Sequence, residues 1–291
     1  MQNEKGYFMF NDLERNKHIM DKNKNNAPIG VFDSGVGGLT VAREIIRQLP
    51  NESIVYFGDT ARVPYGSKSK DTIIRYARQI VRFLRTKDVK AIVVACNTAS
   101  AFALDTIEKE LDIPVIGVVK PGAKSAIENT KNKRIGIIGT EGTIKSELYT
   151  EYIHGIDSEI SVIGKPCPLF VPLVEEGMLH DSVTDEVASR YLSELKKQDI
   201  DSLILGCTHY PLLRSTVGKI MGPEVNLVNP AYETAISLDM LLRQNHIKAD
   251  ETAHPKYEFY VSDAADKFKS FANSIMPFHT DMINQINIEQ Y

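Results

Sequence analysis

Short apolar runs alternate with longer segments of helical periodicity along most of this chain. In the first half, the apolar runs lie at residues 28–32, 53–59, 91–95 and 113–118. The helical patterns lie at residues 39–49 and 72–85. Strands that are buried on both faces form continuous apolar runs, so this alternation is typical of βα units around a mostly parallel sheet. Pro121 fits the first turn of a further helix, where its missing N–H would have no partner in any case.

The pattern restarts near residue 134. The apolar runs lie at residues 134–139, 161–164, 202–206 and 226–230. A glycine-bearing turn and its helix follow the first run, at residues 140–149. Residues 170–177 form an irregular or short helical segment, and residues 181–197 an amphipathic helix. A further helix and a strand at residues 257–261 follow within residues 231–275. The second half therefore predicts a second α/β unit, followed by a return to the first.

The two halves match each other at two places. Setting Ile29 over Ile135 gives an offset of 135 − 29 = 106, and setting Cys96 over Cys207 gives 207 − 96 = 111. Two nearly equal offsets favour an internal duplication at the level of structure, although apolar strands can also match by chance. This pattern predicts a polar N-terminal extension at residues 1–27. It predicts a first lobe formed by residues 28–119 plus 231–291, and a second lobe formed by residues 120–230.

Charge and composition narrow the function classes. With 34 basic and 38 acidic side chains, the formal net charge is 34 − 38 = −4, and neither sign forms a long block. This distribution offers no footprint for nucleic acid or an anionic membrane, and a small polar ligand suits it better. No apolar run approaches the roughly 20 residues of a spanning helix, and the first 26 residues lack a secretion signal. We therefore expect a soluble, cytoplasmic protein.

The three cysteines are too few and too widely spaced for a disulfide framework. Cys167 lies between two prolines and is interpreted as a small buried hydrophobic residue. Cys96 and Cys207 each follow a predicted buried strand. Ligands of parallel sheets bind beyond the carboxyl ends of the strands, and a helix beginning just after each cysteine would favour the thiolate.

Two such thiols on opposite faces of a carbon atom could act as base and acid. One would remove a proton and the other would return one to the opposite face, which is racemisation without a cofactor. Each cysteine alone could instead be a buried structural residue. The polar residues that follow them argue against an apolar environment; they are Asn97, Thr98, Thr208 and His209.

Other candidates near these strand ends each have two interpretations. His209 could be a packed core histidine or the partner of Cys207. Asp33 could cap a helix or stand beside Cys96, because it begins the glycine-rich turn DSGVGG after the first strand. This turn lacks the spacing of a dinucleotide fingerprint, so it is either a plain turn or an anion site. Tyr65 and Gly66 lie in a predicted turn that could offer backbone donors to a carboxylate.

Adjacent carboxylates follow in the segment VEEG. Glu175 and Glu176 would ordinarily be solvated surface charges, and a carboxylate that faced His209 would make one of them functional.

Taken together, the segments FDSGVGGLTV, GDTARVPYG, ACNTASA, VEEG and LGCTHYPLL resemble the cofactor-independent glutamate racemases of the aspartate/glutamate racemase superfamily. The resemblance runs from about residue 28 to beyond residue 230. It implies an α/β fold of two pseudo-twofold-related lobes, each a mostly parallel sheet flanked by helices, with D- or L-glutamate held between them. It also implies no cofactor, no metal, a role in supplying D-glutamate for peptidoglycan, and a homodimer, since some relatives form dimers.

The resemblance assigns roles residue by residue. Cys96 matches the base for D-glutamate and Cys207 the base for L-glutamate, with Asp33 assisting Cys96, and His209, backed by Glu175, assisting Cys207. The substrate contacts it implies are Asp33, Ser34, Tyr65, Gly66, Asn97, Thr98, Thr140, Thr143, Thr208 and His209.

Three alternatives stay open. An aspartate racemase of the same superfamily would differ by one methylene of substrate length. A Cys–His amidohydrolase would need only one cysteine and would release an amine. A non-catalytic amino-acid sensor would bind glutamate without exchanging its α-proton.

Overall fold

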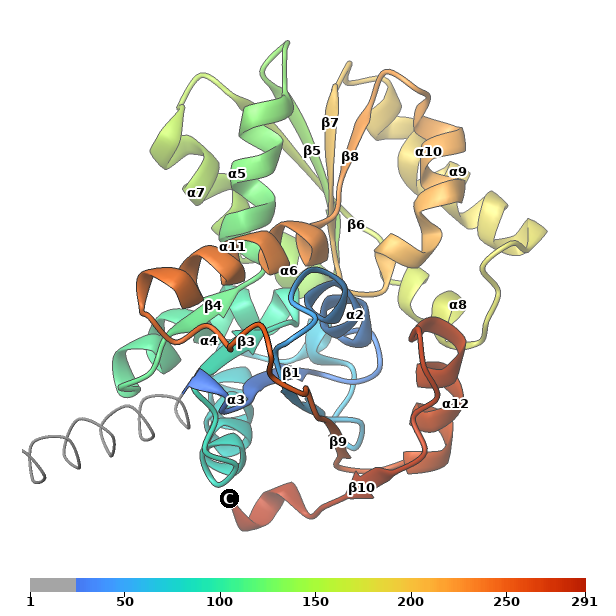
Figure 1. Ribbon diagram of the computed structural model, residues 1–291. Coiled ribbons are helices and arrows are strands. Elements are labelled where there is room, and N and C mark those ends of the chain that lie inside the picture. The colour runs from blue at the N-terminus through green and yellow to red at the C-terminus, as the bar shows by residue number, and fades with distance from the viewer. Residues whose placement is uncertain (1–24) are drawn as a thin grey trace, which may run out of the picture.

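The structure is a computed structural model that describes residues 25–291. The polar extension expected at residues 1–27 lies almost entirely outside this range. The described chain forms two parallel sheets, each covered by helices on both faces (Figure 1). This is the predicted two-lobed α/β fold, which is confirmed.

The first sheet has the strand order β10-β9-β2-β1-β3-β4. Its strands are β1 (Ile29–Asp33), β2 (Ile54–Gly58), β3 (Ala91–Val94), β4 (Val115–Gly117), β9 (Tyr257–Val261) and β10 (Ile283–Gln285). The helical elements around it are α2 (Leu39–Gln48), η1 (Tyr65–Ser67), α3 (Lys70–Arg85), α4 (Asn97–Glu110), α11 (Pro230–Gln244), α12 (Ala265–Ile275) and η3 (Ile288–Gln290). Residues of α2, α11 and α12 pack on one face of the sheet, and residues of α3 and α4 on the other. We call this unit the first lobe.

The second sheet has the strand order β6-β5-β7-β8. Its strands are β5 (Arg134–Gly139), β6 (Ser161–Pro166), β7 (Ser202–Gly206) and β8 (Asn226–Val228). The helical elements around it are α5 (Val119–Asn129), α6 (Glu141–Lys145), α7 (Leu148–Ile156), α8 (Phe170–Glu175), α9 (Ser182–Lys196), η2 (Tyr210–Leu213) and α10 (Arg214–Met221). Residues of α8, α9 and α10 pack on one face, and residues of α5 and α7 on the other. We call this unit the second lobe.

The two sheets repeat one topology. The order β2-β1-β3-β4 in the first corresponds to β6-β5-β7-β8 in the second. The strand register preserves the offsets found in the sequence, since Ile29 pairs with Ala91 and Ile135 pairs with Ser202, and 202 − 91 = 111. The repeated topology agrees with the predicted internal duplication.

The lobes meet at α5 and α11, which contact each other (Figure 1). Helix α5 packs its apolar residues into the second lobe, and α11 packs its own into the first. The boundaries expected at residues 119/120 and 230/231 fall at the start of each helix, and we retain them as a proposal.

Several local expectations differ from the structure. Helix α3 begins at Lys70 instead of residue 72, because the Ser69 side chain accepts a hydrogen bond from the backbone of Thr72 and caps the helix two residues earlier. The helix expected after residue 140 is two helices, since Glu147 adopts a left-handed conformation with φ 54° between them. Strand β10 was not predicted, because three residues on a sheet edge carry no clear periodicity.

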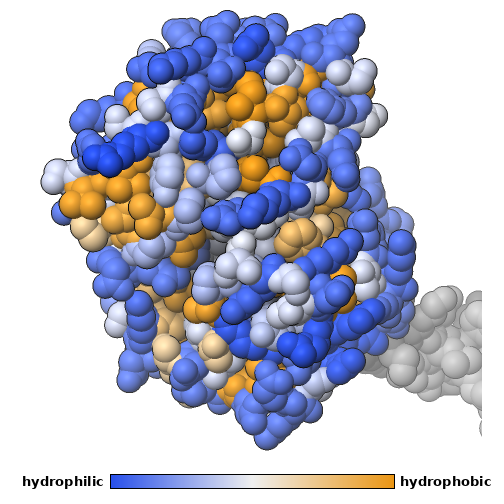
Figure 2. Space-filling view, turned by 180° about the vertical axis from the view of Figure 1, so that it is seen from behind, coloured by the Kyte–Doolittle hydropathy of each residue, from blue (hydrophilic) through white to orange (hydrophobic). Residues whose placement is uncertain are grey.

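The surface is mostly hydrophilic when seen from behind, and its apolar side chains gather in separate patches (Figure 2). Large exposed apolar side chains include Tyr232, Ile236 and Met240, which repeat every fourth residue on one side of α11. Among residues 25–291, no helix combines the length and the apolarity that crossing a bilayer requires.

Candidate active site

A cavity of about 470 Å³ lies at the carboxyl ends of both sheets. The first lobe supplies the loop after β1, the segment around η1 and the start of α4, and the second lobe supplies the loops after β5, β6 and β7. Its lining includes Ser34, Tyr65, Gly66, Cys96, Asn97, Thr98, Thr140, Glu175, Cys207, Thr208 and His209. The structure therefore brings together most of the residues singled out in the sequence, while Asp33 and Thr143 are buried just behind this lining.

The lining also contains residues that the sequence did not single out. They are Val63, Pro64, Ser67, Glu141, Pro168, Val171 and Pro172. The first three flank Tyr65 and Gly66, so their position in the same loop could have indicated them. The prolines and valines carry no reactive group, and only the fold places them here.

Cys96 lies two residues after β3 and is the N-cap of α4. Its Sγ accepts a hydrogen bond from the backbone N–H of Ala99 at 3.4 Å and donates one to Ser34 Oγ at 3.8 Å. Burial raises the pKa of the Cys96 thiol to about 12, the charge of Asp33 adds to this rise, and the Ala99 N–H opposes it. The helix start is thus present as expected, but burial outweighs it. This raised pKa favours the protonated thiol, which is the state expected for one of the two cysteines.

Asp33 ends β1 and is fully buried. Its Oδ2 accepts hydrogen bonds from the backbone N–H groups of Gly35 and Gly38, both at 3.0 Å, so it does cap the start of α2. Burial raises the pKa of Asp33, while the positive charge of His209 and these N–H groups act in the opposite direction. Asp33 also influences the titration of Cys96, so both interpretations of this carboxylate apply.

Cys207 follows β7 directly, but no helix begins beside it. The next helical element is η2, which begins at Tyr210, and the Cys207 N–H is bonded to the carbonyl of Leu205. The expected helix start at this cysteine is therefore wrong. A different partner takes its place, since Cys207 Sγ lies 3.7 Å from Nδ1 of His209.

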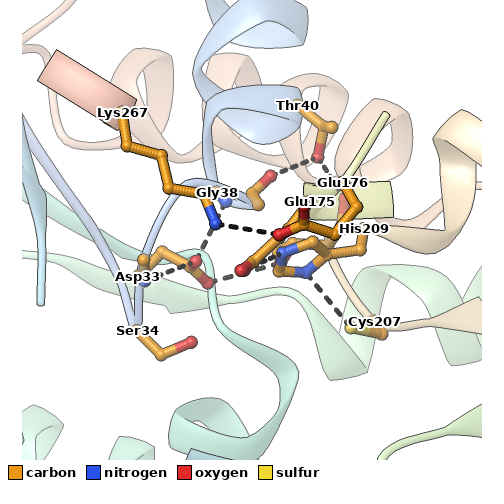
Figure 3. A network of polar contacts seen from close by, with 12 residues as sticks. Asp33, Ser34, Gly38, Thr40, Glu175, Glu176, Cys207, His209 and Lys267 are labelled. Carbon is orange, nitrogen blue, oxygen red and sulfur yellow. Dashed lines mark hydrogen bonds and ion pairs between the residues drawn. The ribbon is translucent and has the colours of Figure 1, made fainter. Parts of the chain in front are cut away.

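His209 stands between Cys207 and Glu175 (Figure 3). Its Nε2 lies 3.0 Å from Glu175 Oε1, and its side chain is only 5% exposed. Burial acts to lower the pKa of His209, but the hydrogen bonds with Cys207 and Glu175 overcome it and raise the pKa to about 10. An imidazolium held between a sulfur and a carboxylate places a positive charge beside Cys207.

The two adjacent glutamates have different surroundings. The hydrogen bond from His209 lowers the pKa of Glu175, against the effect of burial. Glu176 instead pairs with Lys267 of α12 at 3.3 Å, and both side chains are exposed (Figure 3). Glu175 is thus the carboxylate that faces His209, and Glu176 forms an ion pair between the lobes.

On another side of the cavity, threonine hydroxyl groups of the two lobes contact each other. Thr98 Oγ1 lies 3.0 Å from Thr140 Oγ1 and 3.3 Å from Thr143 Oγ1. Asn97 accepts a hydrogen bond from the Tyr149 hydroxyl at 2.7 Å through its Oδ1. Tyr149 was not singled out in the sequence, where it ends the segment 140–149 that is expected to form a turn and a helix.

The loop before η1 is fixed by a buried network. The Tyr65 hydroxyl donates to Asp59, which also accepts a hydrogen bond from Arg62 at 2.7 Å. A Cβ atom on Gly66 would lie 2.7 Å from the Thr140 Cβ, so only glycine allows this loop to approach the second lobe so closely. The sequence indicated a turn here, and the structure adds a contact between lobes.

The third cysteine is apart from this site. Cys167 is fully buried in the core of the second lobe, as predicted. The described cysteines are all free thiols. Among residues 25–291, no group of three or more histidine, cysteine, aspartate or glutamate side chains could hold a metal ion.

Comparisons with known proteins match this geometry. A family model for Asp/Glu/hydantoin racemases matches residues 29–235. A glutamate racemase of Geobacter metallireducens is 47% identical over 261 residues, which cover 90% of this chain and 97% of that protein. The crystal structure of glutamate racemase isoform RacE1 from Bacillus anthracis has a TM-score of 0.87 at 43% identity, covering 90% of this chain and 98% of that one. A Francisella tularensis glutamate racemase, solved in complex with D-glutamate, has a TM-score of 0.86 at 40% identity, covering 92% and 100%.

Proposed function

This chain belongs to the Asp/Glu/hydantoin racemase family, and from that premise we propose that it interconverts L- and D-glutamate by proton transfer at the α-carbon between two thiols. The observation that carries the proposal is the placement of Cys96 and Cys207 in the lining of one cavity, each supplied by a different lobe. It is supported by relatives that are named glutamate racemases, which this chain matches over nearly their whole length.

In the direction from L- to D-glutamate, Cys207 acts as the base. The thiolate, stabilised by the His209 imidazolium, takes the α-proton and becomes a thiol. Cys96 gives its S–H proton to the opposite face of the same carbon and becomes the thiolate. The return reaction reverses both transfers, so protons and charge balance in each direction. Asp33 assists Cys96, and Glu175 holds His209.

The α-proton of an amino acid is a poor acid, and cofactor-free chemistry has no conjugated ring to spread the negative charge. Preorganised donors and exclusion of water must therefore stabilise the carbanion-like transition state. The side chains and backbone groups proposed to hold the substrate are those of Asp33, Ser34, Tyr65, Gly66, Asn97, Thr98, Thr140, Thr143, Thr208 and His209. Because the cavity lies between the lobes, we expect them to separate for substrate entry and to close for the reaction.

The proposed role is supply of D-glutamate for peptidoglycan in the cytoplasm. We also propose a homodimer, and the exposed apolar stripe of Tyr232, Ile236 and Met240 on α11 supports an association of this kind. Light scattering of the purified protein measures the oligomeric state, and a monomer at micromolar concentration would contradict it.

The test of the function is turnover in heavy water with each enantiomer of glutamate and of aspartate, without added cofactor. We expect both enantiomers of glutamate to racemise and to gain deuterium at Cα. Turnover of aspartate alone would assign the protein to the shorter substrate. Release of an amine would favour the Cys–His hydrolase, which the Cys207–His209–Glu175 arrangement alone would suit. Binding of glutamate without exchange would leave a sensor.

A further inference from the structure

The turn between β1 and α2 packs directly on His209, although the two belong to different lobes. Gly37 of this turn lies against the imidazole edge formed by Cε1 and Nδ1. Nδ1 is also the atom that faces Cys207. The first lobe therefore contacts His209 at the ring atom that faces Cys207.

No side chain fits between Gly37 and this ring. A Cβ atom built on Gly37 would lie 2.4 Å from Thr208 Oγ1 and 2.5 Å from both Cε1 and Nδ1 of His209, whereas real Cβ atoms essentially never approach within 3.0 Å of such an atom. The ring has no room to retreat, because it is fixed by Glu175 on one side and Cys207 on the other. The φ angle of Gly37 is not positive, so the glycine is needed for this contact and not for backbone conformation.

A buried hydroxyl group holds the same contact together. Thr40 Oγ1 lies 3.0 Å from the carbonyl of Gly37 and 2.9 Å from the carbonyl of Thr208. Thr40 is completely buried and lies in α2 of the first lobe, while Thr208 precedes His209 in the second. The loop bearing Cys207 and His209 is thus docked on the start of α2 when the lobes are in contact.

We propose that Gly37 is a positioning residue for racemisation, which sets the place of the His209 ring relative to Cys207 when the lobes close. This inference rests on the proposed function, because it takes His209 to be the helper of Cys207. It adds that the second thiol is made competent by the first lobe, so that domain closure and assembly of the acid–base pair are one event.

The first experiment is Gly37→Ala with Gly35→Ala as its matched control. Gly35 lies in the same turn, and a Cβ there would meet only Cγ1 of Val63, at 3.1 Å, a tight contact that needs a shift of a few tenths of an ångström. Misplacement of a catalytic group by about 1 Å can cost roughly 100-fold in rate, so we expect kcat of Gly37→Ala to fall by that order. We expect Gly35→Ala to stay within about threefold of the parent. Equal kcat values for Gly37→Ala and the parent would overturn the proposal.

A double-mutant cycle separates positioning from a general structural defect. If Gly37 acts through His209, then Gly37→Ala should add little to the loss already caused by His209→Ala, because the ring it displaces is gone. Multiplying losses would contradict the proposal. If Gly37→Ala does not fold but the double variant does, the clash with the ring is supported. Unfolding of both would assign the clash to the Thr208 side chain instead of the His209 ring and overturn the proposal.

A third measurement does not depend on turnover. The His209 imidazole signal is assigned in the NMR spectrum by its absence from His209→Ala, and its pKa is then followed in Gly37→Ala. We expect the pKa to fall from about 10, since a displaced ring loses its contacts with Cys207 and Glu175. An unchanged titration would overturn the proposal even if the parent protein racemised no amino acid, so its failure is distinct from failure of the proposed function.

Discussion

The two lobes carry one topology and one repeated cysteine, yet they equip that cysteine differently. With the offset of 106, Asp33 of the first lobe corresponds to Gly139 of the second, since 33 + 106 = 139. With the offset of 111, His209 corresponds to Thr98, since 209 − 111 = 98. A carboxylate at the end of β1 raises the pKa of one thiol, and an imidazole two residues beyond the other thiol contacts its sulfur.

This difference gives the resting site a direction. Cys96 is a buried thiol with a pKa of about 12, whereas Cys207 lies beside an imidazolium. In the proposed mechanism this arrangement suits Cys96 as the acid and Cys207 as the base, which is the direction that starts from L-glutamate. A repeated fold preserves the position of a reactive group, and its neighbours decide its protonation state.

Enantiomers have equal free energy in water, and this restricts how the asymmetry can be expressed. At equilibrium both are equally abundant, so kcat/KM must be the same in the two directions however unlike the thiols are. The difference between the lobes can appear only in kcat and KM taken separately, or in the half-reaction of a single thiol. The predictions below use these readouts.

Removing either thiol breaks the comparison outright. Cys96→Ala and Cys207→Ala should each lower racemisation by roughly 10⁴-fold or more, the upper range for loss of a positioned acid or base. In heavy water, Cys96→Ala should retain slow α-proton exchange with L-glutamate only, because Cys207 still faces that enantiomer. Cys207→Ala should retain slow α-proton exchange with D-glutamate only, because Cys96 still faces that enantiomer. The measurement is optical rotation together with NMR of the α-proton.

Cys167→Ala is the control for both variants. Cys167 is fully buried but lies in the core of the second lobe, outside the cavity. We expect normal turnover with a somewhat lower melting temperature. Racemisation by either of the first two variants would rule out the two-thiol scheme.

Asp33→Asn should weaken the first lobe's half of the site. The charge of Asp33 raises the pKa of Cys96, so its removal should lower that pKa and make Cys96 a weaker base for D-glutamate. We expect kcat to fall by roughly 100-fold. The Cys96 titration is measured by thiolate absorbance in a Cys207→Ala background, with and without Asp33→Asn. An unchanged midpoint would show that the pKa of Cys96 does not depend on Asp33.

Glu175→Gln should weaken the second lobe's half less, because His209 keeps its bond to Cys207. The proposed reaction from L- to D-glutamate needs His209 protonated, so its rate should fall as the pH rises through the His209 pKa of about 10. Glu175 is one of the groups that raise this pKa, so Glu175→Gln should move the fall to lower pH and reduce kcat by about tenfold. The check is a pH profile of kcat, with kcat/KM for the two enantiomers staying equal.

The sequence contained most of this site because its chemistry is local to strand ends. Cys96, Cys207 and His209 follow apolar runs, and parallel strands bring their carboxyl ends to one edge, so their convergence could be predicted. What could not be predicted depends on burial and on contacts across the lobes. The raised pKa of Cys96 and the contact of Gly37 with His209 both require the packed structure.

Glu176→Gln should have the smallest effect and sharpens the difference between neighbouring carboxylates. Glu176 pairs with Lys267 at 3.3 Å, and both side chains are well exposed, so this ion pair is screened by water. It joins the second lobe to α12 of the first, and its loss should change KM for either enantiomer by less than about twofold, consistent with the small free energies of exposed ion pairs. High salt should reproduce this change in the parent and have no further effect on the variant. A shift of the pH profile like that of Glu175→Gln would mean that Glu176 also acts on His209, because an exposed ion pair alone cannot move a buried imidazole's titration by a measurable amount.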